Sequence, residues 1–347
     1  AALAGGFFVF ASYQLFYVSL GQFNIASSHW VPYTIIFVFK SGRDLRSLRW
    51  AALAALFLVM QTWAEMTYAS FLLVFIALYI VYELFFNLQY LVSNLKFAVR
   101  NLILLALLFA IGISPLLVAM IPDMLAQGDF WVQGSGFAET FSADLAGFLV
   151  PTMRHPLFGG LVSGTGIANF DKGQHIYLGF ILLGLAVLGV LAGTSRRKSA
   201  TWFWLIAALG FAWLSLGPSI HVNGSDTGIP GPFLVLQSLP FFKGNRYPSR
   251  YSVMLVLSLA MLAAVGIETV LQKLSRPRPA SRERQEAVRS PWIAVLAIPV
   301  LLSILFVFEH LSIPVPQSNM RVPEPYKAIA AEPGEFVILD IPVAWRN

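Results

Sequence analysis

The chain has no cysteine, and charged residues make up only 12% of its 347 residues. The first absence excludes disulfide bonds, thiolate catalysis and metal sites built on cysteine. The second is unusual, because charged residues form about a quarter of a typical soluble domain. Hydrophobic residues make up 57% of the chain, which is more than a soluble fold of this length needs. The composition therefore indicates an integral membrane protein.

The sequence also lacks the local motifs that identify many soluble enzymes. It has no Gly-rich phosphate loop before a helix, no nucleophile elbow and no HExxH zinc motif. The net charge of +6 would suggest a nucleic-acid partner in a soluble protein. Most basic residues here lie at the ends of apolar stretches, where membrane headgroups favour them. We therefore expect the lipid bilayer as partner, and no nucleic acid.

Nine apolar stretches are present, and the hydrocarbon core of a bilayer takes roughly 20 apolar residues per helix. The sequence predicts an all-α integral membrane protein, a polytopic bundle of about nine transmembrane helices. The predicted helices lie near residues 1–20, 24–39, 50–65, 70–86, 102–121, 176–191, 201–216, 252–271 and 292–308.

The lysines and arginines are distributed unevenly between these helices. Fifteen of the 23 lie in every second gap, and these gaps are short. Short loops rich in lysine and arginine stay in the cytoplasm, so we assign these gaps to the cytoplasmic side. The long segments 122–174 and 217–250, and the tail after residue 309, are then extracytoplasmic.

The two ends of the chain predict its domain organisation. Prolines interrupt the tail after residue 309, residues 326–331 suit a short helix, and residues 335–342 form an apolar run typical of a buried strand. We expect a transmembrane domain at 1–309 and the start of an extracytoplasmic α/β domain at 310–347. Ala1 already lies in an apolar stretch and the chain ends just after the predicted strand, so we expect a fragment that lacks sequence at both ends.

The densest group of cations on the predicted outer side contains Lys243, Arg246 and Arg250, within eight residues. Arginine pairs with two phosphate oxygens at once. Pro248 and Ser249 suit the start of a helix, whose N-terminus itself favours an anion. These residues predict a phosphate site. The alternative is an ordinary belt of aromatic residues and cations at the outer leaflet.

Other polar residues on the predicted outer side form a second set of candidates. Glu65 lies in a short turn between apolar helices, where a lone carboxylate is costly and often functional. All five histidines fall on this side or at an outer helix end. That distribution indicates either a polar site or simply where polar side chains are tolerated. The candidates are Glu65, His155, His175 and His221.

Three segments resemble bacterial membrane proteins of the GT-C glycosyltransferase superfamily, notably its large YfhO-like members. They are FNIASSHWVP at 23–32, LPFFKGNRYPSRY at 239–251, and a tail with VPEPYK at 322–327 and FVILDIP at 336–342. The resemblance spans most of the chain, although each motif is short.

The resemblance implies an inverting transferase that takes a sugar from a polyprenyl-phosphate donor on the outer face of the bacterial plasma membrane. In that superfamily an acidic residue of the first outer loop acts as base or as ligand of a divalent cation, Mg²⁺ or Mn²⁺. That loop would lie before Ala1, so no catalytic acid is assigned and we expect the chain alone to be inactive. Only Arg246 and Arg250 match the family pattern, and we assign them to the donor phosphate.

Two other functions fit the same composition. One is a transporter or flippase for a lipid or polysaccharide, and the other is a non-catalytic membrane scaffold. Transporters usually show internal repeats and polar residues at the membrane midplane. The chain shows no convincing repeat and has few charges inside its apolar stretches, which favours the enzyme over the transporter.

Overall fold

A computed structural model describes residues 2–127, 137–170, 176–196, 198–239, 242, 245–275, 291–314, 324–335 and 337. The chain divides into two compact units, Ala1–Pro314 and Val315–Asn347. The first unit therefore extends five residues beyond the boundary expected from the sequence.

The described part of the first unit is mostly helical. Each of the nine predicted segments contains a helix, because long apolar runs without polar interruption favour helix in a membrane. The longer helices are α1 (Ala2–Val9), α2 (Ser12–Ser19), α4 (Trp30–Arg43), α5 (Leu48–Ala64), α6 (Met66–Phe86), α8 (Leu95–Gln127), α11 (Phe180–Arg196), α12 (Lys198–Ser215), α14 (Ser252–Ser275) and α15 (Pro291–Glu309). The short ones are α3 (Phe23–Ala26), α7 (Leu88–Ser93), α9 (Phe137–Thr140), α10 (Gly159–Gly164), α13 (Phe233–Leu236) and the 3₁₀ turn η1 (Pro248–Tyr251).

Nine membrane spans are not confirmed. Among the described residues, three helices are long and apolar enough to cross a membrane: Met66–Phe86, Leu95–Asp123 and Pro248–Lys273. Helices α1 and α2, bent by 43°, make a fourth if they form one span. The other apolar helices have at most 19 residues within the described chain. At 1.5 Å per residue they are shorter than the roughly 30 Å hydrocarbon core. The described residues thus indicate a membrane protein, and the nine spans stay a prediction.

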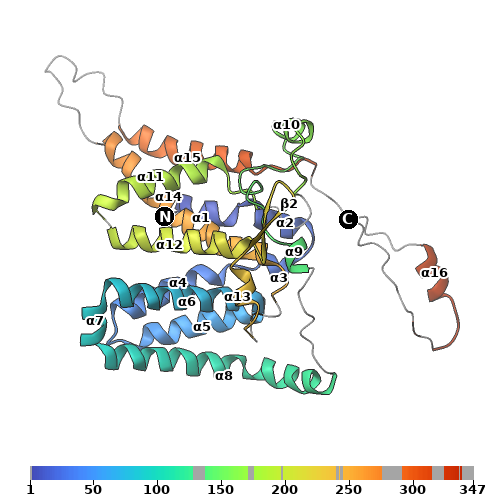
Figure 1. Ribbon diagram of the computed structural model, residues 1–347, viewed down its shortest axis with the longest axis horizontal. Helices are drawn as coiled ribbons and strands as arrows, with labels where there is room; N and C mark the ends of the chain where they lie inside the picture. The colour runs from blue at the N-terminus through green and yellow to red at the C-terminus, as the bar shows by residue number, and fades with distance from the viewer. Residues whose placement is uncertain are drawn as a thin grey trace, which may run out of the picture. The chain divides into compact units, whose positions relative to one another are not determined.

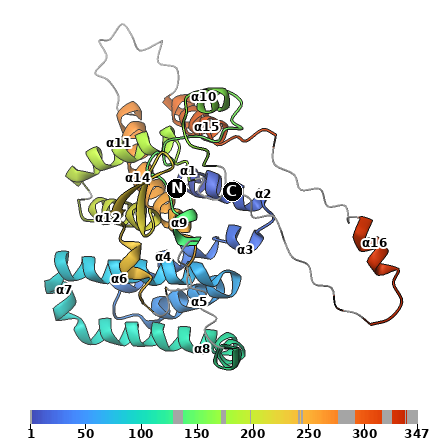
Figure 2. The same cartoon turned by 45° about the vertical axis from the view of Figure 1, so that its right-hand side comes forward.

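The long helices form two groups, which Figures 1 and 2 show as separate layers. In one group α5 packs against α4, α6 and α8; we call it the α5 group. In the other, α14 packs against α1, α11, α12 and α15; we call it the α14 group. Helices α11 and α14 approach closely because glycines face backbone at their crossing. A Cβ added at Gly189 would lie 1.9 Å from the Leu262 oxygen, and one at Gly266 would lie 2.2 Å from the Leu185 oxygen.

Opposite ends of the bundle carry different kinds of structure. One end carries α9, α10 and the antiparallel hairpin of β1 (Ser219–Val222) and β2 (Ser225–Pro230); we call it the hairpin end (Figure 1). The described parts of the basic loops lie at the other end, where the Tyr90 hydroxyl donates to the Arg43 oxygen at 3.0 Å and the Arg100 guanidinium donates to the oxygens of Leu45 and Arg46. The alternation of basic and long loops in the sequence therefore corresponds to two ends of one bundle.

The described part of the second unit contains α16 (Glu324–Ala330), close to the helix predicted at 326–331. Lys327 pairs with Glu324 one turn away, at 2.5 Å. Most of the strand predicted at 335–342 lies outside the described residues, so the start of an outer α/β domain stays a prediction.

Candidate anion-binding site

Arg250 lies at the hairpin end, in the turn that leads into α14. Its guanidinium carbon is 4.1 Å from the centroid of the Tyr247 ring and 5.4 Å from that of Tyr17. Its Nε donates to the Tyr17 hydroxyl at 3.4 Å. Among the described residues, no carboxylate forms an ion pair with it. Two aromatic rings thus hold the cation, and its terminal N–H groups remain available for an anion.

Arg246 is presented by the same segment but reaches a different element. Its side chain is exposed, and the guanidinium lies 5.5 Å from the ring centroid of Phe137 in α9. It also forms no ion pair with a described carboxylate. Lys243, the third predicted cation, lies outside the described residues.

Buried contacts fix the backbone that carries both arginines. Pro248 begins the turn η1, whose φ requirement proline satisfies. The Ser249 amide donates to the Phe141 oxygen at 3.1 Å, and the Asn245 amide group donates to the Ser70 hydroxyl at 2.9 Å. The fully buried Tyr251 packs on Phe71 at 4.0 Å between ring centroids. The arginines therefore project from a well-anchored turn.

Glu65 and Arg250, which 185 residues separate, both lie within electrostatic range of Tyr17. It caps the start of α6, accepting hydrogen bonds from the Thr67 amide at 3.2 Å and the Thr67 hydroxyl at 2.6 Å. Asn24 donates a third, at 2.6 Å. The charges of both Glu65 and Arg250 act on the Tyr17 hydroxyl. We call Tyr17, Glu65, Tyr247 and Arg250 the Arg250 cluster.

His155 connects the loop after α9 to α15 through hydrogen bonds. The side chain is 3% exposed. Its Nδ1 accepts from the amides of Leu157 and Phe158, each at 3.1 Å. Its Nε2 is therefore the protonated nitrogen, and it donates to the Phe308 oxygen at 2.9 Å. Both nitrogens are occupied, so the geometry favours an architectural role.

The other two predicted histidines do not join the Arg250 cluster on the contacts described. His221 lies in β1, and its Nδ1 donates to the Ser219 oxygen at 3.0 Å. His175 lies outside the described residues. Of the predicted polar set, Glu65 is the member that acts electrostatically on Tyr17, whose hydroxyl accepts from Arg250.

The β1–β2 hairpin and Asp144, the acid that holds it, were not predicted from the sequence. Asp144 is 4% exposed. Its carboxylate accepts from the amides of Asn223 at 2.9 Å, Gly224 at 2.7 Å and Ala146 at 2.7 Å. The sequence does contain a signal for this hairpin. Asn223-Gly224 lies between two β-prone runs, and Asn-Gly in that setting is the strongest short-range hairpin pattern. Both turn residues have positive φ, 50° and 78°.

A small polar cavity of 310 Å³ lies beside this turn. Glu139, Asn169 and His221 are among the residues that line it. No group of three or more His, Asp or Glu side chains in the described chain is arranged to hold a metal ion. The described residues thus give no assignment for the divalent cation that the family resemblance implies.

No family model, curated protein or solved structure matches the chain. Function must therefore be argued from the geometry of the Arg250 cluster and from the chemistry of its residues.

Proposed function

We propose that the chain belongs to a membrane glycosyltransferase that takes a sugar from a polyprenyl-phosphate donor at the hairpin end. We further propose that this end is extracytoplasmic, in a multi-pass protein of a bacterial plasma membrane. The observation that supports the proposal is the set of contacts that two guanidinium groups make. Arg246 and Arg250 both rest on aromatic rings, and neither pairs with a carboxylate of the described chain.

This arrangement suits a phosphate that leaves during the reaction. In glycosyl transfer the bond between the anomeric carbon and the phosphate oxygen breaks, and negative charge develops on that oxygen. A guanidinium already fixed near it stabilises this charge without reorganising. Tyr17 and Tyr247 would fix the Arg250 guanidinium, while the rings of Phe137 and Phe141 offer apolar surface for the first isoprene units. The base that takes the proton from the acceptor hydroxyl is not among the residues we assign.

The test is donor-lipid binding by the full-length protein in lipid nanodiscs. R246Q/R250Q should weaken binding of a polyprenyl phosphate by at least about tenfold, because each charge-assisted hydrogen bond contributes about 1.5–3 kcal/mol. R250K should recover only part of the loss, because lysine cannot reproduce the two-point contact.

The matched control is R154Q, which removes an exposed cation from another loop of the same predicted side. Unchanged affinity in R246Q/R250Q would refute the phosphate assignment. Normal donor binding without any transferase activity in the full-length protein would instead favour the transporter or the scaffold.

A further inference from the structure

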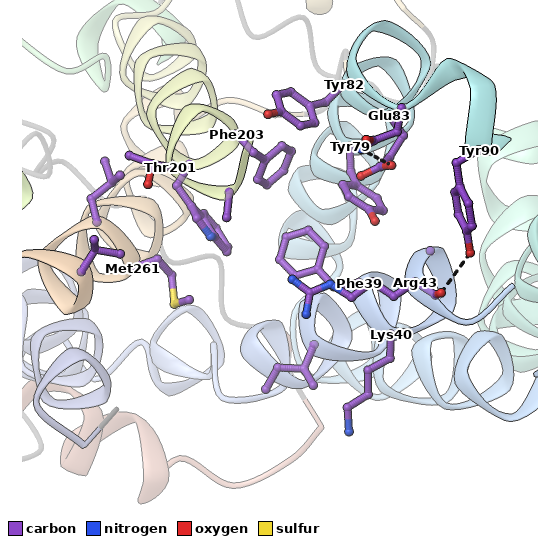
Figure 3. Close-up of a pocket in the computed structure, with 17 residues that line it drawn as sticks. Phe39, Lys40, Arg43, Tyr79, Tyr82, Glu83, Tyr90, Thr201, Phe203 and Met261 are labelled. Atoms are coloured by element: carbon purple, nitrogen blue, oxygen red, sulfur yellow. Dashed lines mark hydrogen bonds between the residues drawn. The ribbon is translucent and has the colours of Figure 1, made fainter. Parts of the chain in front are cut away.

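A second, larger cavity lies at the end opposite the hairpin, between the two helix groups. Its volume is 1160 Å³, above the roughly 300–1,000 Å³ typical of small-molecule sites. Figure 3 shows side chains from both groups converging on it. The α5 group contributes residues of α4 and α6, and the α14 group contributes residues of α12 and α14.

The inner wall of this cavity is largely aromatic. Phe39 of α4 contacts Tyr79 at 4.9 Å and Phe203 of α12 at 5.4 Å between ring centroids. Tyr82 contacts Phe203 from the other side, at 5.2 Å. These rings bridge the helix groups, and the cavity lining beside them is mostly apolar, which suits a hydrocarbon chain.

Two basic residues and one acid line the cavity within the described chain. Lys40 and Arg43 line it with exposed side chains, and neither pairs with a carboxylate of the described chain. The Lys40 ammonium lies 4.5 Å from the Trp50 ring centroid, and the Arg43 guanidinium acts electrostatically on the Tyr79 hydroxyl. Glu83, the one lining acid among the described residues, accepts from the Asn87 amide group at 2.9 Å.

We propose that this cavity binds an anionic phospholipid of the cytoplasmic leaflet, with its phosphate at Lys40 and Arg43 and one acyl chain beside Phe39, Tyr79 and Phe203. The net positive charge of the lining residues matches the ligand, and anionic lipids are concentrated in the leaflet that basic loops face. The inference depends on the membrane orientation assigned from the basic loops. It does not depend on the glycosyltransferase proposal, because the site lies at the other end of the bundle.

The headgroup test uses the purified chain in detergent, titrated with phosphatidylglycerol or phosphatidylcholine and read by native mass spectrometry. We expect selective retention of phosphatidylglycerol. K40Q/R43Q should weaken its binding by at least about tenfold, since a basic residue near an anionic surface contributes about fivefold. The matched control R46Q/R49Q removes the same charge from the same loop without touching the cavity lining.

Three results would overturn the proposal. One is equal binding of the two lipids. Another is an equal loss in R46Q/R49Q, which would mean general surface attraction. The third is binding of glycerol 3-phosphate as tight as that of the lipid, which would mean that the cavity takes a soluble phosphate.

The chain test locates the lipid inside the cavity. Trp204 lines the cavity, whereas Trp213 on the same helix is 57% exposed. Phosphatidylglycerol brominated on its acyl chains should quench Trp204, so W204F should lose a saturable quenching component that W213F retains. Identical quenching curves for the two variants would place the lipid outside the cavity and contradict the proposal.

Discussion

Glu309 is the last residue of α15, and its carboxylate accepts hydrogen bonds from the first residues of α11. It accepts from the amides of Phe180 at 2.6 Å and Ile181 at 3.2 Å, and from the Tyr177 hydroxyl at 3.0 Å. The side chain is 7% exposed. A carboxylate at a helix N-terminus satisfies unpaired amides and interacts favourably with the helix dipole. One residue thus joins α11 to α15.

Tyr177 makes this contact dependent on pH. Burial, and then the Glu309 carboxylate beside it, raise the pKa of the Tyr177 hydroxyl. The folded state therefore keeps the proton more tightly than the unfolded state, whose tyrosine pKa is about 10. The resulting stability is present below about pH 10 and is lost as the pH rises through the folded-state pKa.

We expect Y177F to lose less thermal stability than the wild type when the pH is raised above about 10. Melting temperatures in detergent at a series of pH values would measure this. Y33F is the control, because Tyr33 is exposed on α4. Parallel curves for the wild type and Y177F would show that Tyr177 has no part in the pH dependence.

At the scale of elements, the β1–β2 hairpin lies in the segment 217–250, which the sequence predicts to be extracytoplasmic. Contacts with another loop fix its conformation. The β1–β2 turn is held at its tip by Asp144 from a segment 79 residues earlier. The isolated bridge between Asp144 and His221 adds a second attachment. By contrast, Asp226 on β2 is fully exposed, and its pKa is lowered by hydrogen bonds from the Ser219 hydroxyl and the Gly228 amide. The buried acid, rather than the exposed one, anchors the hairpin.

D144A should therefore release the hairpin tip while leaving the helices folded. It removes the acceptor for the amides of Asn223 and Gly224, at a local cost of about 2–4 kcal/mol. Hydrogen exchange should become faster at these two amides. D226A, on the same hairpin, should have little effect on them. Unchanged exchange in D144A would mean that other contacts hold the tip.

At the scale of the whole molecule, the first unit combines two helix groups with different packing. The α14 group is dense, since α11 and α14 cross where glycines meet backbone. The two groups meet mainly through the aromatic residues of α4, α6 and α12, and the 1160 Å³ cavity lies beside that contact. The tight helix crossing and the cavity thus share α14, with Leu262 at both.

The glycine crossing predicts a position-specific effect. G266A would place a methyl group 2.2 Å from the Leu185 oxygen, which is backbone and has little freedom to move. We expect a loss of about 1–3 kcal/mol of stability from this overpacking. G210A, where nothing lies within 4 Å of the added carbon, should be neutral or slightly stabilising. A thermal unfolding assay in detergent compares the two, and equal melting temperatures would contradict the close crossing.

The helices could be predicted from the sequence because long apolar runs determine where helix is favourable in a membrane. Their interruptions could not. The bend after α1 places the polar Gln14 and Ser28 side chains in contact with each other, and that contact depends on tertiary packing. The two arginines were singled out because cations are exceptional on the side predicted to be outer. The Asp144 anchor and the cavity at the end opposite the hairpin join residues far apart in sequence, so local patterns carry little sign of them.

The membership of the two helix groups has a consequence for assembly. The α5 group is continuous in sequence and can pack as soon as α8 has been inserted. Helix α1 precedes it in the chain but packs against α14 and α15, with Phe7 and Phe306 at 4.6 Å between ring centroids. During synthesis α1 therefore remains without these packing partners until α14 and α15 have been made. Until then, lipid or the insertion machinery must cover the surface of α1 that packs against them.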